Sequence, residues 1–200
     1  MAPRIGVLAL QGAFAEHVSL LGTLDVDATE VRTVGQLDNI DALIVPGGES
    51  TSMAKLMDIY ALREPLRDFA RSGKPVWGTC AGLILLAGRL IEDRPEPLAL
   101  MDMTVQRNGF GRQVDSFETD VEVGGIAGGP FHAVFIRAPA ITEVGQGVQV
   151  LARLDDGTIV AARERNLLVT AFHPELTNDP RLHRYFVEMA DAAVEIGAAR

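Results

Sequence analysis

The sequence has a single cysteine, Cys80, and no long apolar run. One thiol cannot form a disulfide within the chain, which excludes the disulfide frameworks typical of small secreted proteins. The apolar run near the start, Ile5 to Leu10, is too short for the core of a signal peptide or for a membrane span. These absences predict a cytoplasmic protein that has no membrane partner.

Positive charge is also scarce. The chain has 18 Lys and Arg against 27 Asp and Glu, a formal net charge of -9. No dense stripe of basic residues could follow a phosphate backbone, so nucleic acid is not expected as a partner. With 200 residues, of which 48% are hydrophobic and 22% charged, the chain resembles an ordinary globular protein. We expect one domain over residues 1–200.

Strand and helix patterns alternate through the first half of the chain. Strand-like runs lie at 4–10, 28–34, 41–48 and 74–79, and helical patterns lie at 13–24, 50–73 and 81–90. This order predicts a parallel sheet with helices on both faces. In the first helix, Phe14, Val18 and Leu21 form the expected apolar face and His17 is expected to point elsewhere. Ser50, Thr51 and Ser52 are candidate N-caps of the second helix.

The second half of the chain reads as short strands. Strand-like runs lie at 100–107, 116–123, 132–138, 148–154, 158–164 and 167–173, and a helical pattern at 179–197 follows. We expect several of these strands to pair antiparallel and to extend the same sheet. The last helix should place Leu182, Phe186, Met189 and Ala193 on one face.

Ligands of such sheets bind beyond the carboxyl ends of the parallel strands. Three loops lie there: Gln11-Gly12, the stretch 46–50, and the stretch 78–82. The third reads Gly-Thr-Cys-Ala-Gly, the cysteine counterpart of the nucleophile elbow, in which glycines two residues from the nucleophile permit a tight turn. A lone cysteine is more often a buried apolar residue. The strand before Cys80 and the helix after it favour a nucleophile instead.

A nucleophilic cysteine needs a base, and the chain has four histidines. Three of them are expected to be surface or structural residues: His17, His132 and His183. His173 differs because it ends an apolar strand and is followed by Pro174-Glu175. Residues two apart in an extended chain point to the same side, so Glu175 could orient the imidazole while His173 takes the proton of Cys80.

Six ordered motifs between Ile5 and Met189 carry a family resemblance. They are GVLALQGAFAEH, PGGESTSM, GTCAGLILLA, RNGFGRQVDSFE, VFIRAP and HPELTNDPRLHRYF. The sequence resembles the triad, class I-type glutamine amidotransferases, and most specifically the glutaminase subunits of pyridoxal 5'-phosphate synthase. The resemblance implies an α/β fold with a mixed, mostly parallel sheet between helices, a flavodoxin-like three-layer sandwich. It also implies that L-glutamine is hydrolysed to glutamate and ammonia with no metal or organic cofactor. The ammonia would pass to a separate synthase subunit in a large hetero-oligomer that makes pyridoxal 5'-phosphate.

The resemblance also implies a role for individual residues. Cys80 would attack the side-chain amide, His173 would carry the proton, and Glu175 would orient His173. The backbone N–H groups of Gly48 and Ala81 would bind the oxyanion. Residues implied in glutamine binding are Gly48, Glu49, Ser50, Arg107, Ile136 and Arg137. Either arginine suits an α-carboxylate, and Glu49 or backbone carbonyls suit an α-ammonium.

Two other readings keep part of this picture. Other α/β proteins with an elbow cysteine act as peptidases, deglycases or redox sensors. A non-enzymatic regulatory subunit would only bind a synthase partner. Release of glutamate from glutamine, measured with and without the partner, distinguishes these alternatives.

Overall fold

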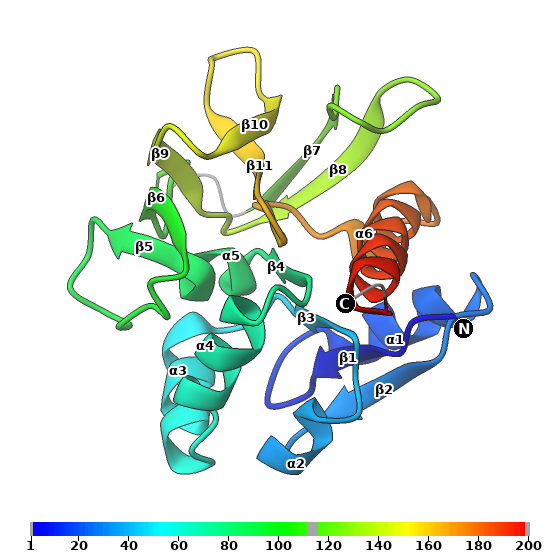
Figure 1. Ribbon diagram of the computed structural model, residues 1–200. Helices are drawn as coiled ribbons and strands as arrows, with labels where there is room; N and C mark the ends of the chain where they lie inside the picture. The colour runs from blue at the N-terminus through cyan, green and yellow to red at the C-terminus, as the bar shows by residue number, and fades with distance from the viewer. Residues whose placement is uncertain (1, 112–115, 199–200) are drawn as a thin grey trace.

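The computed structural model describes residues 2–111 and 116–198. These residues form a sheet of ten strands and the helices that cover it (Figure 1). Five neighbouring strands are parallel, in the order β2 (Ala28–Val31), β1 (Ile5–Leu8), β3 (Ala42–Val45), β4 (Val76–Thr79) and β12 (Leu167–Thr170). The carboxyl ends of these strands share one edge of the sheet. The loops that follow β1, β3, β4 and β12 therefore gather at that edge.

The other half of the sheet is mixed. It continues from β12 through β11 (Ile159–Glu164), β9 (Ala140–Val144), β6 (Met101–Gln106) and β5 (Ala87–Leu90), and β10 (Gln149–Arg153) pairs with β11. The β12–β11, β11–β9, β9–β6 and β10–β11 pairs are antiparallel, and β5 is parallel to β6. The expectation that later strands extend the first sheet is confirmed.

Two of the expected strands do not join this sheet. Strands β7 (Ser116–Val121) and β8 (Phe131–Ile136) form a separate antiparallel pair, seen at the top of Figure 1. Burial alternates along both strands, so one face of the pair is covered and the other faces water. Phe117 and Phe135 stack on the covered face, with ring centroids 4.5 Å apart.

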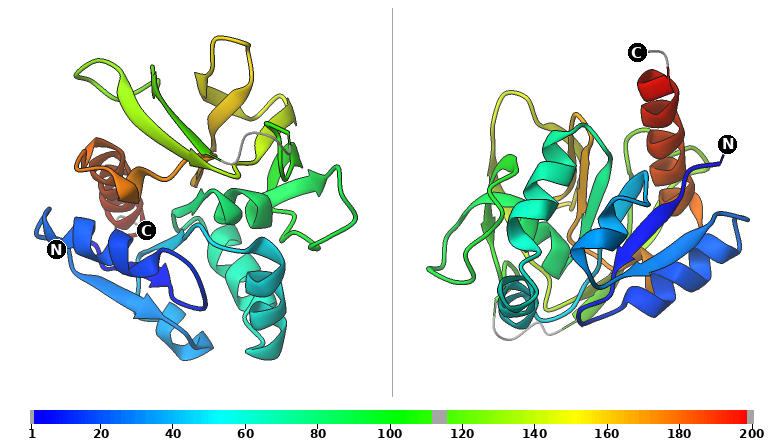
Figure 2. Two further views of the ribbon diagram at one scale, coloured as in Figure 1. Left: turned by 180° about the vertical axis from the view of Figure 1, so that it is seen from behind. Right: turned by 60° about the horizontal axis from the view of Figure 1, so that its bottom comes forward.

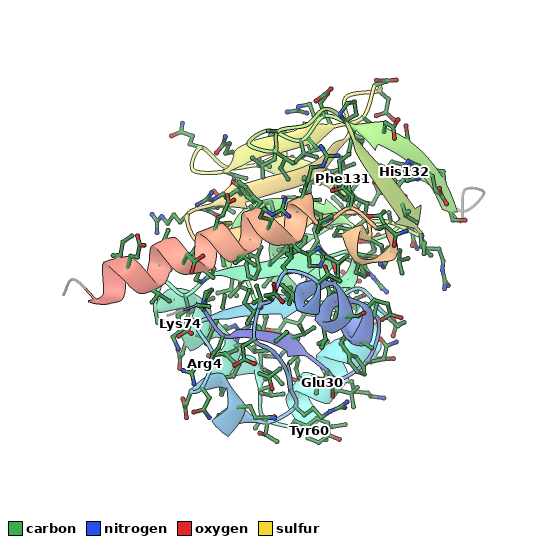
Figure 3. All side chains as sticks on the ribbon, turned by 90° about the vertical axis from the view of Figure 1, so that its right-hand side faces the viewer. Arg4, Glu30, Tyr60, Lys74, Phe131 and His132 are labelled. Carbon is green, nitrogen blue, oxygen red and sulfur yellow. The ribbon has the colours of Figure 1, made fainter. Side chains whose placement is uncertain are left out.

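Helices cover both faces of the large sheet, as predicted. Helices α1 (Phe14–Gly22) and α6 (Arg181–Ala198) lie together on one face (Figures 1 and 2). The other face carries α2 (Val34–Leu37), α3 (Ser50–Ile59), α4 (Arg63–Arg71) and α5 (Ala81–Leu86). Figure 3 shows α6 running along its face of the sheet, with Leu182, Phe186 and Met189 buried and Ala193 partly buried. No described helix is both long and apolar enough to cross a membrane.

The helix expected over 50–73 is two helices. Helix α3 ends at Ile59 and α4 begins at Arg63, and between them Ala61 has a φ of 52°, in the left-handed region that a right-handed helix cannot include. The expected N-caps are also wrong. The cap of α3 is Glu49, whose carboxylate accepts hydrogen bonds from the backbone N–H groups of Thr51 and Ser52.

The helix expected over 81–90 ends early. Helix α5 stops at Leu86 because the chain continues directly into strand β5. Gly88 lies so close to its neighbouring strand that an added Cβ would be 2.7 Å from the backbone oxygen of Met101. The apolar pattern of this segment fits a buried helix and a buried strand equally well, so it does not show where one becomes the other.

Candidate active site

Cys80 lies on a strained turn between β4 and α5. Its φ of 47° and ψ of -101° are unusual for a residue with a side chain, and its backbone N–H donates to the carbonyl of Thr170 at 2.8 Å. The flanking glycines permit this turn. A Cβ added to Gly78 would lie 2.6 Å from the carbonyl carbon of Gly82, and a Cβ added to Gly82 would lie 2.0 Å from the carbonyl oxygen of Val45. The elbow predicted from the sequence is therefore formed.

His173 and Glu175 lie together, but not on an extended strand. Strand β12 ends at Thr170, and a 3-10 turn at Pro174–Leu176 follows His173. Within this turn, Nδ1 of His173 lies 2.7 Å from Oε1 of Glu175. The expected contact is present, while the extended geometry from which it was predicted is wrong. Both side chains are buried, so little water competes for their interaction.

The charge of His173 depends on both of its partners. Burial of the ring lowers its pKa, but hydrogen bonds to the side chains of Cys80 and Glu175 outweigh burial and raise the pKa to about 10. A negative charge on either partner favours the imidazolium further. At neutral pH this raised pKa favours the imidazolium, the form that can donate a proton to a leaving group.

A cavity of about 450 Å³ opens beside the cysteine. Its lining includes Cys80, His173 and all six residues that the resemblance assigns to glutamine: Gly48, Glu49, Ser50, Arg107, Ile136 and Arg137. Ala81 and Glu175 are not in this lining; Ala81 follows Cys80 in the elbow, and Glu175 lies behind His173. Such a volume is within the usual range for small-molecule sites.

A second, larger cavity lies away from this chemistry. Its volume is about 760 Å³, and it is bounded by Lys74, Asn166 and Met189 among others. Lys74 and Asn166 precede strands β4 and β12, so this cavity lies at the opposite edge of the sheet from Cys80. We place the candidate site at the smaller cavity because the reactive groups converge there. Among the described residues, no group of three or more His, Cys, Asp or Glu could hold a metal ion.

Glu49 and Arg107 both line the cavity, and their charged groups form an ion pair. Burial tends to raise the pKa of Glu49, but hydrogen bonds from Ser52 and Thr51 outweigh it and lower the pKa to about 2. This carboxylate is therefore negative at neutral pH and can attract an ammonium group. Nη2 of Arg107 lies 3.5 Å from Oε1 of Glu49, and Nη1 donates to the carbonyl of Arg94 at 3.0 Å.

The loop after β1 supports the Gly47-Gly48 segment, and the sequence reasoning assigned no site residue there. The backbone N–H of Ala13 donates to the carbonyl of Gly47 at 3.0 Å, and the side-chain oxygen of Gln11 accepts from the N–H of Glu49 at 2.7 Å. Gln11 also lines the cavity. Its place at the end of the first strand, among the three expected ligand loops, was the available signal.

The remaining histidines fall into two kinds. His132 is exposed on β8, near the top of Figure 3, between Glu118 and Asp120. His17 and His183 are fully buried, so the expectation that His17 faces away from the core is wrong. Position 17 lies on the side of helix α1 that packs against α6 and against the turn at Glu175, so its side chain is buried. Only the tertiary structure shows this.

Comparison with known proteins identifies the family of this chain. The model of the SNO glutamine amidotransferase family matches residues 7–192. A relative from Dehalococcoides mccartyi, described as pyridoxal 5'-phosphate synthase subunit PdxT, is 58% identical over 189 residues, covering 94% of this chain and 97% of the relative. A relative of the same description from Salinispora arenicola is 53% identical over 199 residues, covering 96% and 99%. These relatives confirm the resemblance that the six motifs predicted.

A solved structure shows the same fold. A crystal structure described as a glutamine amidotransferase superposes with a TM-score of 0.88 at 49% sequence identity, covering 94% of this chain and 98% of the other. The predicted class of fold, a mostly parallel sheet between helices as in class I glutamine amidotransferases, is thereby confirmed. Because the family model spans nearly the whole chain and the relatives match over almost their full length, this protein belongs to the SNO glutamine amidotransferase family.

Proposed function

We propose that this protein is the glutaminase subunit of a pyridoxal 5'-phosphate synthase and that residues 1–200 form one glutamine amidotransferase domain. The observation that carries the proposal is the convergence of a strained elbow cysteine and a hydrogen-bonded His173–Glu175 pair on one cavity. This arrangement has the parts of a nucleophilic triad: a nucleophile, a base and a group that orients the base.

In the first half of the reaction, the Cys80 thiolate attacks the side-chain amide carbon of L-glutamine. The carbonyl oxygen becomes an oxyanion, which the backbone N–H groups of Gly48 and Ala81 would stabilise. The His173 imidazolium then donates its proton to the amide nitrogen as the carbon–nitrogen bond breaks. Ammonia leaves, and a γ-glutamyl thioester remains on Cys80.

In the second half, water attacks the thioester carbonyl. His173, now neutral, takes a proton from the water, and the carbon–sulfur bond breaks to return the thiolate. Glutamate leaves and the imidazolium is restored. Throughout, Glu175 fixes the ring orientation and stabilises its positive charge. These steps use water, the groups that line the cavity, the backbone N–H of Ala81 and the carboxylate of Glu175 behind His173.

Substrate binding uses the charged groups at the cavity mouth. Arg107 or Arg137 would hold the α-carboxylate of glutamine, while Glu49 would attract its α-ammonium. Ser50 and Ile136 line the space in between. We further propose that the ammonia passes to a synthase subunit in a hetero-oligomer, as the description of the relatives implies. On this view, the isolated chain releases glutamate slowly until that partner docks.

The test is glutamate release from L-glutamine by the purified chain, alone and with its synthase partner. Cys80→Ala should abolish the activity while circular dichroism stays unchanged. His173→Asn should lower kcat by at least about a hundredfold, because general acid–base catalysis contributes about that much or more. His132→Asn is the matched control and should retain the wild-type rate, since that ring is exposed on β8. Activity in Cys80→Ala would refute the assignment.

A further inference from the structure

His17 is a fully buried side chain on α1 to which the proposed mechanism gives no role. Its Nε2 atom lies 3.4 Å from Oε2 of Glu175 and 3.3 Å from the hydroxyl oxygen of Thr79. Its Nδ1 atom lies 2.9 Å from Nε2 of His183 on α6. The ring therefore connects two helices on one face of the sheet to the carboxylate that orients His173.

The two oxygens of the Glu175 carboxylate have different surroundings. Its Oε1 atom faces Nδ1 of His173 at 2.7 Å, whereas its buried Oε2 atom has no hydrogen-bond partner among the described residues. A buried carboxylate oxygen without a donor is costly. Nε2 of His17 is within reach of this oxygen, and hydrogen bonds in ligand-free enzymes are often long and shorten when substrate binds.

One assignment of ring protons suits the whole cluster. If Nε2 of His183 donates to Nδ1 of His17, then Nε2 of His17 carries a proton that faces Glu175. This leaves Nδ1 of His183 as a bare acceptor, and that atom has no partner among the described residues. The reverse assignment would bury an unpaired N–H on His183 and aim a lone pair of His17 at a carboxylate. Both changes are unfavourable.

The rings of His17 and His183 are also neutral. Burial, together with the nearby His183 and His173, holds the pKa of His17 well below its usual value, and burial lowers the pKa of His183 to about 3. The other groups that face His17 are the carboxylate of Glu175 and, from β4, the uncharged Thr79 and Trp77. A neutral donor can orient the carboxylate without cancelling the negative charge that stabilises the His173 imidazolium.

We propose that His17 is a positioning residue for the triad: its Nε2–H holds Oε2 of Glu175, so that Oε1 keeps His173 aligned on Cys80. This inference rests on the proposed function, and it extends the triad from the loops at the sheet edge to helices α1 and α6. Without the donor, the carboxylate could rotate about its last side-chain bond, and His173 would lose part of its orientation.

The experiment compares His17→Leu, which has no donor, with His17→Gln, whose amide nitrogen can take the place of Nε2. We expect His17→Leu to lower kcat about tenfold or more with KM changed less than about twofold, since only the proton-transfer geometry is affected. His17→Gln should stay within about threefold of the wild-type kcat, because it restores the N–H.

A second readout needs neither substrate nor partner. Cys80 is the only cysteine, so the rate of alkylation by iodoacetamide reports on that side chain alone. The His173 imidazolium favours the reactive thiolate, so a poorly oriented Glu175 should move the acid limb of the alkylation profile to higher pH. We expect a shift of about half a pH unit or more in His17→Leu, and none in His17→Gln.

Wild-type kcat and a wild-type alkylation profile in His17→Leu would overturn the inference. Equal loss of kcat in both variants with unchanged alkylation profiles would also overturn it, because ring packing alone would then explain the loss. If His17→Leu does not fold, His17→Phe retains a ring beside Trp77 and is judged by the same criteria. Activity in Cys80→Ala would instead refute the proposed function, independently of position 17.

Discussion

Acid should unfold this protein partly through the two buried histidines. Burial lowers the pKa of His183 from 6.5 to about 3, so the folded chain leaves that ring unprotonated at pH 5 while the unfolded chain protonates it. A lowered pKa means that the stability is fully present above 6.5 and is lost as the pH falls towards 3. His17 acts in the same direction. The informative perturbation is a fall in pH applied to wild type and to His183→Phe.

The magnitude follows from the interval between the two pKa values. Each pH unit below 6.5 costs about 1.4 kcal/mol for one proton bound only by the unfolded chain, so pH 5 costs about 2 kcal/mol for His183 alone. A typical domain has a free energy of unfolding of about 5 to 15 kcal/mol, so this loss is about a fifth of a mid-range value. The wild type should therefore lose about 2 kcal/mol more than His183→Phe between pH 7.5 and pH 5.

Urea unfolding at several pH values measures this difference. Trp77 is the only tryptophan and lies against His183, with ring centroids 4.9 Å apart, so its fluorescence reports on the same region. His132→Gln is the control. Hydrogen bonds to Glu118 and Asp120 raise the pKa of this exposed histidine, so its contribution is lost as the pH rises and has the opposite sign. Equal acid losses in wild type and His183→Phe would refute the reasoning.

Two further predictions concern the candidate site. Gly47→Ala should lower kcat by about a hundredfold or more, because the new Cβ would lie 2.3 Å from Cε1 of His173 and displace the proposed general acid–base group. Gly35→Ala is the control and should keep the wild-type rate, since no atom of the described residues lies within 4 Å of its added Cβ. Arg107→Ala should raise KM for glutamine about tenfold or more, because a charged hydrogen bond contributes about 1.5 to 3 kcal/mol, while the free energy of unfolding stays unchanged. An unchanged KM would exclude Arg107 from substrate binding.

The fold could be predicted where the hydrophobic pattern had one interpretation. Continuous apolar runs placed β1, β3 and β4 correctly because strands buried on both faces leave few alternatives. The pattern failed where two structures bury the same residues. Residues 81–90 are apolar enough for a helix or a strand, and the chain uses both. The break at Ala61 depends on a backbone conformation that composition does not reveal.

The three residues of the proposed triad were predicted because their chemistry is local in sequence, whereas the residues assigned to glutamine binding came from the family resemblance. Gly78, Cys80 and Gly82 form one turn, and His173 and Glu175 lie two residues apart. The contact between the last two nevertheless arises from a 3-10 turn, so the correct pair came from an incorrect geometry. Gln11 was missed as a site residue because its role is to accept a hydrogen bond from a distant loop, which a single segment of sequence cannot show.

His17 shows the limit of helical periodicity most clearly. Its helix has Phe14 and Val18 only partly buried, while the polar His17 is completely buried. An amphipathic helix normally turns its apolar residues inwards, so a buried polar residue indicates a partner that satisfies it. Here the hydrogen-bond partners are Thr79 on β4 and His183 on α6, both distant in sequence, and Oε2 of Glu175 lies 3.4 Å from Nε2 of His17. Helix α1 therefore packs around a polar contact beside the carboxylate of Glu175, and the proposed role of His17 would link the packing of α1 and α6 to the geometry at Cys80.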